Sequence, residues 1–347
     1  MTLPRQAPMQ WSVESWDPAY GLPGEALDLD DSSADVVVDI EAPAADWAPV
    51  DVPPPVVAGG AATGAVVFVD GVRRVDARAW VHGPDGDVAP ALCATYGAGA
   101  VRCVSNPPDL PAADAFPAGS PVAVDAFSAG RSARIAAVLI ERGLFTSSPH
   151  AADVHTRAGD YPVRAVGSTR TEALPLALQS RMAELEIAAA EAACEGGCDL
   201  LVVDGPLRGR GHLPNAVGFI KTHRVAYLPP AQHAVVEALA PGQRTPVFAT
   251  GTAFSRYACY LRLPATGGVA TPWAGVVRLE VPAELAVPVA VALVEYAAGV
   301  LPRYASQAHK EPRAPQNLYP LAGLERELRR RLGDEALLYR ALRIAAA

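Results

Sequence analysis

The sequence of 347 residues has few cysteines, few lysines and few charged side chains overall. Five cysteines are too few, and odd in number, for a disulfide scaffold. Charged residues make up 19% and hydrophobic residues 50%, a balance that excludes an intrinsically disordered chain. The N-terminus MTLPRQAPMQW lacks the basic-then-apolar pattern of a secretory signal. We therefore expect a globular, cytoplasmic protein with buried or loop thiols.

Several motifs that identify enzyme classes are absent. The seven histidines show no HExxH spacing, and Cys194 and Cys198 have no second cysteine pair, which argues against a zinc site. The run GPLRGRG at 205–211 lacks the Gly-Lys-Ser/Thr ending of a phosphate-binding P-loop. No GxSxG elbow occurs, which argues against an α/β serine hydrolase. No internal repeat is visible either.

The net charge of −8 is distributed unevenly along the chain. Residues 1–60 hold eleven acids and one base, are rich in proline and alanine, and end in DVPPPVVAGG. We expect an acidic N-terminal extension over 1–60 and a domain over 61–347. Residues 205–347 hold 17 bases and 9 acids, which indicates either compositional drift or a surface that faces anions. The extension could be solvated, could cover such a surface, or could contact a partner.

Apolar runs and turn residues predict a mixed α/β fold. An apolar helix over 284–300 contains Pro288 and Glu295 and falls short of the ~20 residues of a membrane span, so we expect it to be buried. Strands are predicted at 65–70, 75–81 (after a turn at Gly71), 88–96, 100–104, 199–204, 246–248, 257–263 and 275–281, a strand or short helix at 217–228, and helices at 129–142, 171–194, 284–300 and 321–345.

Two predicted strands end in the same way, as Val69-Asp70-Gly71 and Val203-Asp204-Gly205. A carboxylate at the end of a buried strand points from a rigid element into a cleft, and the glycine allows close approach of another group. Two such acids could share Mg²⁺ or Mn²⁺. Asp-Gly is also a common turn pair, so two ordinary turns are the alternative.

The helix over 171–194 offers a third acid, either Glu184 or Glu186. Glu184 shares a polar face with Arg181. Glu186 falls with Met182, Ala189 and neighbouring small residues, where a carboxylate needs a metal or a buried arginine as partner. We therefore prefer Glu186 as the functional acid and keep Glu184 as the alternative.

A dense polar stretch over 302–320 contains His309 between two predicted helices. Its arginine, histidine, asparagine and glutamine side chains suit contacts to phosphate oxygens or to a metal-bound phosphate. A solvated loop is the alternative interpretation.

Taken together, these blocks resemble the NurA nuclease family, over about residues 61–347. The blocks are VDG at 69–71, the helix with Arg181 and Glu184/Glu186, LLVVDGPL at 200–207, GFIK at 218–221, Arg256-Tyr257, GVVRLEVP at 275–282, Leu301 through His309, Arg313 to Leu318, and Leu324-Glu325 through Asp334. Val72 departs from the small hydroxyl residue that the family often has after its first Asp-Gly, and residues 1–60 have no counterpart.

The resemblance implies an RNase H-like mixed β-sheet flanked by helices, a homodimer, and DNA end processing with a hexameric HerA-like ATPase. It implies a Mn²⁺- or Mg²⁺-dependent nuclease, a 5′–3′ exonuclease and/or single-strand endonuclease, with Asp70, Glu186 and Asp204 as metal ligands and His309 as the late histidine. A non-catalytic adaptor that docks on the ATPase and guides DNA is the alternative. Candidate phosphate contacts are Arg208, Arg210, Lys221, Arg256, Arg303 and Arg313.

Overall fold

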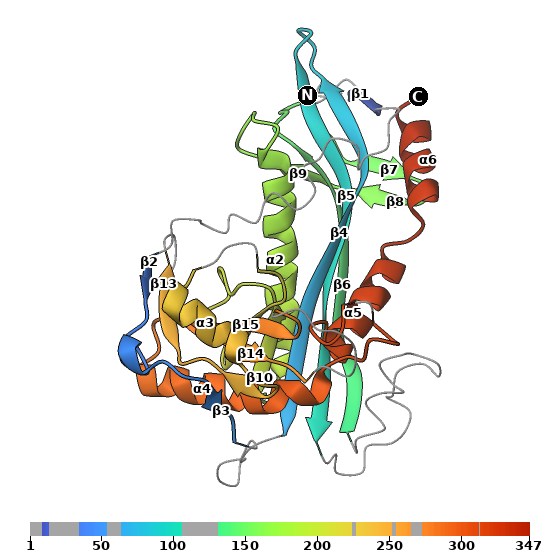
Figure 1. The fold of residues 1–347 in the computed structure, drawn as a ribbon. Helices are drawn as coiled ribbons and strands as arrows, with labels where there is room; N and C mark the ends of the chain where they lie inside the picture. Colours follow the sequence, from blue (N-terminus) through green and yellow to red (C-terminus); the bar gives the residue numbers. More distant parts are fainter. Residues whose placement is uncertain are drawn as a thin grey trace.

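The computed structural model describes residues 9–13, 35–53, 64–105, 131–223, 227–251, 255–264, 273–311 and 313–347. These residues form a mixed α/β fold built on one large sheet with helices packed on both faces (Figure 1). Residues 105–122 are rich in proline and alanine, which predicts a loop, and they fall almost entirely outside the described residues.

The main path of the sheet runs β2-β13-β14-β15-β11-β10-β4-β5-β6-β9. Strand β1 pairs with β4, while β3 and β12 extend the β14 side, and β7 and β8 form a separate small hairpin. The strands are β1 (Gln10–Val13), β2 (Asp35–Val37), β3 (Val50–Asp51), β4 (Ala65–His82), β5 (Val88–Ser105), β6 (Arg131–Thr146), β7 (Val154–Thr156), β8 (Gly159–Tyr161), β9 (Val163–Ala165), β10 (Leu200–Asp204), β11 (Ala216–Ile220), β12 (Gln243–Arg244), β13 (Phe248–Gly251), β14 (Ser255–Arg262) and β15 (Val276–Pro282).

Three long antiparallel strands dominate one half of the sheet, and the sequence did not predict their length. The expected turn at Gly71 is wrong, because Gly71 stays in β4 and pairs with Ala98. The two strands expected over 88–104 are one strand, β5. The helix expected over 129–142 is wrong, because β6 begins at Arg131 and pairs with β5 along its whole length. Cross-strand packing overrides the helical preference of its alanines.

The helices divide between the two faces of the sheet. Helix α2 (Ala173–Cys194) packs its small residues on Val67, Val69 and Val203. The opposite face, which carries Phe68 and Val202, packs against α4 (Val287–Val300) and α5 (Tyr319–Arg331). The remaining helical segments are η1 (Ala44–Asp46), α3 (Pro230–Ala238), η3 (Leu301–Tyr304) and α6 (Glu335–Ala345).

The single helix expected over 321–345 is two helices. Gly333 has a φ of +85°, and this left-handed conformation ends α5 before α6 begins. Asp334 then caps α6, since its side chain accepts a hydrogen bond from Leu337 N.

The run Val287–Tyr304, which includes α4, is apolar enough by length and composition to cross a membrane, with a mean hydropathy of 1.2. Its Ala290, Val294 and Ala297 are fully buried in the core against the sheet. Such packing is typical of the core helix of an α/β protein, in agreement with the expectation of a buried helix.

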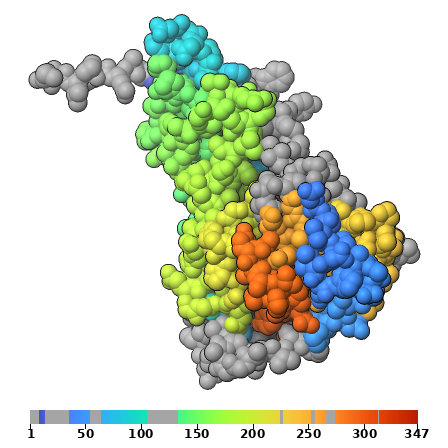
Figure 2. All heavy atoms as spheres, turned by 90° about the vertical axis from the view of Figure 1, so that its left-hand side faces the viewer, coloured from blue at the N-terminus to red at the C-terminus, as the bar shows by residue number. Residues whose placement is uncertain are grey.

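The described part of residues 1–60 belongs to the sheet. Strand β2 pairs with β13, and β3 pairs with β12. The Glu41 carboxylate accepts two hydrogen bonds from the buried Arg244 guanidinium, at 2.7 and 2.8 Å, and one from Val247 N. The ring centroids of Trp47 and Phe248 are 6.1 Å apart. Figure 2 shows residues 35–53 in blue against the orange α4 region, so this acidic segment is built into the fold.

Candidate metal centre

Asp70 and Asp204 lie side by side where β10 ends. Strands β4 and β10 are parallel, and Val69 pairs with Val203, so the next residue on each strand is an aspartate. On its other side Asp70 pairs with Gly99, whose Cα lies under Leu324 and Leu328 of α5. Since neighbouring residues across a sheet share a face, both carboxylates lie on the α5 side. Beyond Asp204 the chain turns at Gly205, which has a φ of +96°.

Burial and mutual repulsion set the protonation of this pair. The pKa of Asp70 is raised well above its usual value, first by burial and then by the negative charge of Asp204. Burial also raises the pKa of Asp204, although the ammonium of Lys221 acts in the opposite direction. The two carboxylates therefore form a partly buried site with excess negative charge, which a cation would stabilise.

Glu186 is brought level with these acids by the corner between α2 and β10. Glu186 lies 8 residues before the C-terminal end of α2, or about 12 Å along the helix. Asp204 lies four residues after the start of β10, or about 13 Å along the strand. Because the chain reverses direction between the two elements, both acids lie at the same height above the corner.

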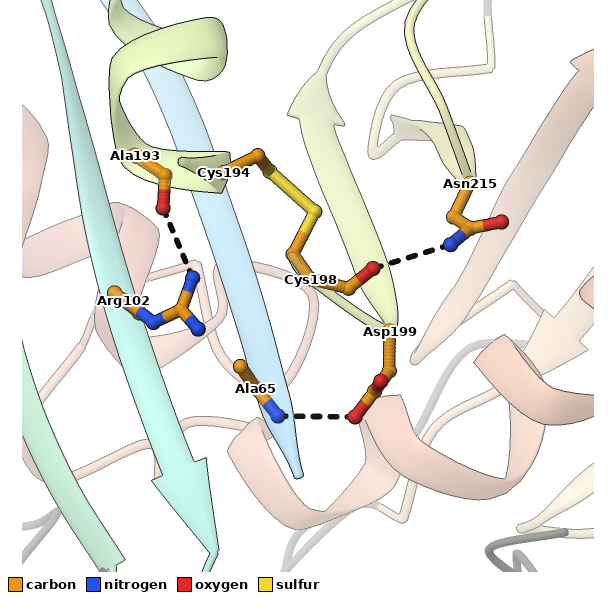
Figure 3. The surroundings of a disulfide bond; sticks show 7 residues. All are labelled: Ala65, Arg102, Ala193, Cys194, Cys198, Asp199 and Asn215. Carbon is orange, nitrogen blue, oxygen red and sulfur yellow. Dashed lines mark hydrogen bonds between the residues drawn. A yellow bond between two sulfur atoms is a disulfide. The ribbon is translucent and has the colours of Figure 1, made fainter. Parts of the chain in front are cut away.

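A disulfide between Cys194 and Cys198 closes this corner (Figure 3), so the expectation of free thiols at these positions is wrong. Hydrogen bonds fix the same region: Arg102 donates to Ala193 O, Asn215 to Cys198 O, and Ala65 N to the Asp199 side chain, at 3.0 to 3.1 Å. The other three cysteines are Cys93, Cys103 and Cys259, all buried thiols.

The carboxylate of Glu186 reaches Gly71 from the α2 face. It is 4% exposed, and a Cβ added at Gly71 would overlap its Oε1. Glu186 forms an ion pair with the buried Arg210, and burial raises its pKa despite that partner. Glu184 is exposed and pairs with Arg181 at the surface. The structure thus brings Glu186, and not Glu184, to the strand that carries Asp70.

Lys221 and Asn317 complete the α5 side of the site. Lys221 follows β11 directly and places its Nζ 2.5 Å from Asp204 Oδ2 and 3.0 Å from Asn317 Oδ1. Asn317 is 1% exposed and was not singled out from the sequence. Its sequence signals are its place in the polar stretch over 302–320 and in the NurA-like block from Arg313 to Leu318.

A fourth acid, Glu325 of α5, was also missed. Its charge raises the pKa of both Asp70 and Asp204. Arg313 and Arg329 bind its carboxylate, at 2.5 and 3.0 Å, and the pKa of Glu325 is lowered because these hydrogen bonds and charges outweigh its burial. Its neighbour Leu324, which packs over Gly99, is the reason that Glu325 lies near Asp70.

A comparison with known protein families identifies the family to which the chain belongs. The NurA domain matches residues 119–330, more than half of the chain. The chain belongs to the NurA domain family. A search of curated proteins returns no match. The matched region contains Glu186, Asp204, His309 and Lys221, whereas Asp70 precedes it. NurA domains are generally nucleases, so family membership places the chain among nucleases at that level.

Within the NurA domain, the remaining predicted site residues divide into exposed and buried ones. His309 lies in an exposed turn after η3. Arg208, Arg303 and Arg313 are exposed, as a contact to DNA requires. Arg210 and Arg256 are buried in ion pairs with Glu186 and Glu280, and the Arg256–Glu280 distance is 2.8 Å. Both are therefore turned inward and not presented to a ligand on the surface.

Within the described ranges, no three histidine, cysteine, aspartate or glutamate side chains lie close enough together to hold a metal ion. Basic side chains separate the acids here: Lys221 holds Asp204 and Arg210 holds Glu186. The four predicted ligands are thus two neighbouring aspartates, a glutamate on the opposite face of β4, and a histidine on an exposed turn.

Proposed function

We propose that this NurA domain protein is a divalent-metal-dependent deoxyribonuclease that hydrolyses phosphodiester bonds in DNA end processing. The observation that carries the proposal is the partly buried pair Asp70 and Asp204, whose pKa values are raised by burial and by neighbouring acids. Two neighbouring carboxylates with raised pKa values destabilise the folded protein when no cation is bound. Such pairs are typical of sites that bind a cation or transfer a proton.

The chemical type of the donors, rather than their present spacing, suits Mg²⁺ or Mn²⁺. Asp70, Asp204 and Glu186 offer hard oxygen ligands, and excess negative charge favours a divalent ion over a neutral ligand. His309 is the candidate nitrogen ligand, on a turn whose exposure leaves it accessible. A bound ion would supply Lewis-acid stabilisation of the phosphate and a lowered pKa for a bound water. The chain's own contribution is to hold these carboxylates on rigid strands and a helix.

The arrangement of the central strands supports an RNase H-like core. Strands β4, β5 and β6 form an antiparallel set, and β10 and β11 continue it in parallel from β4. Helix α2 precedes β10 in the chain and covers one face. In this proposal the acids lie on the central strands β4 and β10 and on the helix that packs on them.

The DNA backbone would approach over the exposed basic residues on the α5 side. Arg313 is more than half exposed and raises the local potential at Asp204. Arg303 lies in η3, in the segment that leads to His309. We further propose cleavage as a 5′–3′ exonuclease and/or single-strand endonuclease, a homodimer, and a HerA-like hexameric ATPase as partner, in line with the family resemblance.

The test is incubation of labelled single- and double-stranded DNA with the full chain in Mn²⁺, in Mg²⁺ and in EDTA. We expect cleavage with a divalent ion and none in EDTA. The alternative, a non-catalytic adaptor, predicts DNA binding and stimulation of the ATPase without cleavage under any of these conditions. That outcome would overturn the nuclease proposal.

A further inference from the structure

Glu186, Asp204 and Glu325 each pair with a basic side chain, and the one that pairs with Asp204, Lys221, lies between two acceptors. Its Nζ lies 2.5 Å from Asp204 Oδ2 and 3.0 Å from Asn317 Oδ1. Resting on the proposed metal-dependent function, we propose that Lys221 is an internal counter-ion for Asp204. It occupies this carboxylate in the metal-free protein and exchanges it for a phosphate oxygen when a divalent cation binds.

The position of Lys221 is fixed on the backbone side. It follows the fully buried Phe219 and the last residue of β11, Ile220. Gln316 Nε2 donates to Lys221 O at 3.3 Å and to Val276 O at 2.9 Å. The side chains of Lys221 and Asp204 are each only 15% exposed. The ammonium therefore cannot swing into bulk water without losing a buried partner, and a short displacement within the site is the available movement.

Asn317 supplies the acceptor that keeps Lys221 in place during such a displacement. Asn317 N donates to Arg313 O at 2.9 Å, and the next residue, Leu318, is fully buried. This fixes the Asn317 amide beside the carboxylates. When Asp204 is occupied by a metal ion, Lys221 retains its hydrogen bond to Asn317 Oδ1 and its charge stays in the site.

The unpaired donor of Asn317 identifies the class of ligand. Its Nδ2 is buried and has no hydrogen-bond partner among the described residues. A buried donor without an acceptor is destabilising, because it has lost its hydrogen bond to water and gained none in the protein. The displaced ammonium and this amide present donors side by side, and an anionic oxygen of a phosphodiester satisfies both. In this proposal Lys221 and Asn317 would hold a phosphate oxygen while Asp204 holds the metal ion.

The counter-ion role makes an unusual prediction about metal affinity. A unit positive charge about 5 Å from a divalent ion opposes its binding even when screened as in bulk water, by an amount equivalent to at least about tenfold in affinity. Removing the charge of Lys221 should therefore tighten metal binding, whereas structural damage to the site should weaken it.

The experiment is calorimetric titration of Mn²⁺ into the metal-free full chain at pH 8. We expect Lys221→Met to bind Mn²⁺ at least about tenfold more tightly than the wild type. Lys221→Arg, which keeps the charge, and Arg343→Met, which removes one positive charge from the exposed end of α6, should bind as the wild type does. With saturating Mn²⁺, Lys221→Met should raise the KM for DNA more than it lowers kcat, because a phosphate contact is lost.

Unchanged or weaker Mn²⁺ binding by Lys221→Met overturns the counter-ion role and leaves the metal site standing. If neither the wild type nor Lys221→Met binds Mn²⁺, the metal-dependent function itself is overturned. Circular dichroism checks that each variant is folded. If Lys221→Met does not fold, Lys221→Gln, which retains a donor toward Asp204, is titrated in its place and decides by the same criteria.

Discussion

Gly71 determines how closely Glu186 approaches β4. The sequence predicted that this glycine allows a turn and a close approach, and only the close approach is present in the structure. A side chain at position 71 would overlap Glu186 Oε1 and lie 3.0 Å from Met182 Cγ. The absent Cβ thus leaves space for a carboxylate on the α2 face, directly beside Asp70 in the chain.

Gly71→Ala is expected to lower the free energy of unfolding by about 1–3 kcal/mol through overpacking. It should lower metal-dependent cleavage much further, by about tenfold or more, because Glu186 has to move away from the site. Urea denaturation and a cleavage assay measure the two effects. Gly167→Ala is the control, since an added Cβ there meets nothing within 4 Å. Full activity of Gly71→Ala would contradict the placement of Glu186.

The raised pKa of Asp70 predicts how the stability of the protein changes with pH. Because its pKa in the folded protein lies above the value of about 3.9 expected for an unfolded chain, its stabilising effect is present at low pH. That effect is lost as the pH rises through the folded pKa. Asp70→Asn, which stays neutral, should be as stable as the wild type at pH 3.5 and more stable at pH 8 without metal.

The expected gain at pH 8 is a free energy of unfolding above that of the wild type, because Asp70→Asn removes the charge that burial and Asp204 disfavour. Urea denaturation in EDTA at both pH values measures it. Asp85→Asn, on the exposed tip between β4 and β5, serves as the matched control and should show no such gain. A loss of stability in Asp70→Asn at pH 8 would show that the Asp70 carboxylate is stabilising when ionised.

Among the elements, those bounded by clear local signals were predicted well. Strand β10, helix α2 and strand β15 begin and end within a few residues of their predicted limits, because glycines and polar residues flank continuous apolar runs. The long strands β4, β5 and β6 were predicted as fragments or as a helix. Their glycines, Gly71, Gly97 and Gly99, suggest breaks, yet they pair within the sheet and make room for side chains from helices and neighbouring strands.

An ion pair between Glu41 and the buried Arg244 anchors the acidic N-terminal segment to the sheet. Burial alone would favour the protonated form of Glu41, but hydrogen bonds from Arg244 and Val247 N outweigh it and lower the pKa of Glu41. Glu41→Ala leaves Arg244, which is 2% exposed, without its carboxylate. Breaking such a pair typically costs about 3–5 kcal/mol.

We therefore expect Glu41→Ala to lower the free energy of unfolding by about 3 kcal/mol at pH 7. The lowered pKa means that this contribution is present above about pH 4.3 and is lost as the pH falls through the folded value. Thermal or urea unfolding at pH 7 and pH 3 measures both effects. Asp46→Ala removes an exposed acid of the same segment and should change little. Equal stability of the two variants would indicate a segment that is merely solvated.

At the scale of the whole molecule, the division of charge along the chain does not translate into two surfaces. In the acidic segment, the charge of Glu41 is neutralised inside the fold by its ion pair with Arg244. Much of the basic C-terminal part is neutralised locally, since Arg329, Arg330 and Arg331 pair with acids of α5. The net charge of −8 therefore does not argue against a DNA substrate, and the +8 of residues 205–347 is not by itself a DNA-binding face.

The candidate site was predictable only where its residues follow local rules. Asp70 and Asp204 end apolar runs, and Glu186 lies on a stripe of small residues, so sequence patterns identify them. Asn317 and Glu325 belong to the site through the packing of α5 on β4 and β5, which no local pattern encodes. The inward turn of Arg210 and Arg256 is likewise a consequence of tertiary pairing with Glu186 and Glu280.

We propose that Asp204, beside Asp70, forms the metal-dependent nuclease centre. The most direct measurement is the rate at which wild type, Asp204→Asn and Glu184→Gln cleave labelled DNA in Mn²⁺, with folding of each checked by circular dichroism. We predict that Asp204→Asn loses cleavage by at least about a hundredfold, while Glu184→Gln, which changes an exposed acid on α2, cleaves as the wild type does. Cleavage by folded Asp204→Asn at the wild-type rate would contradict this assignment.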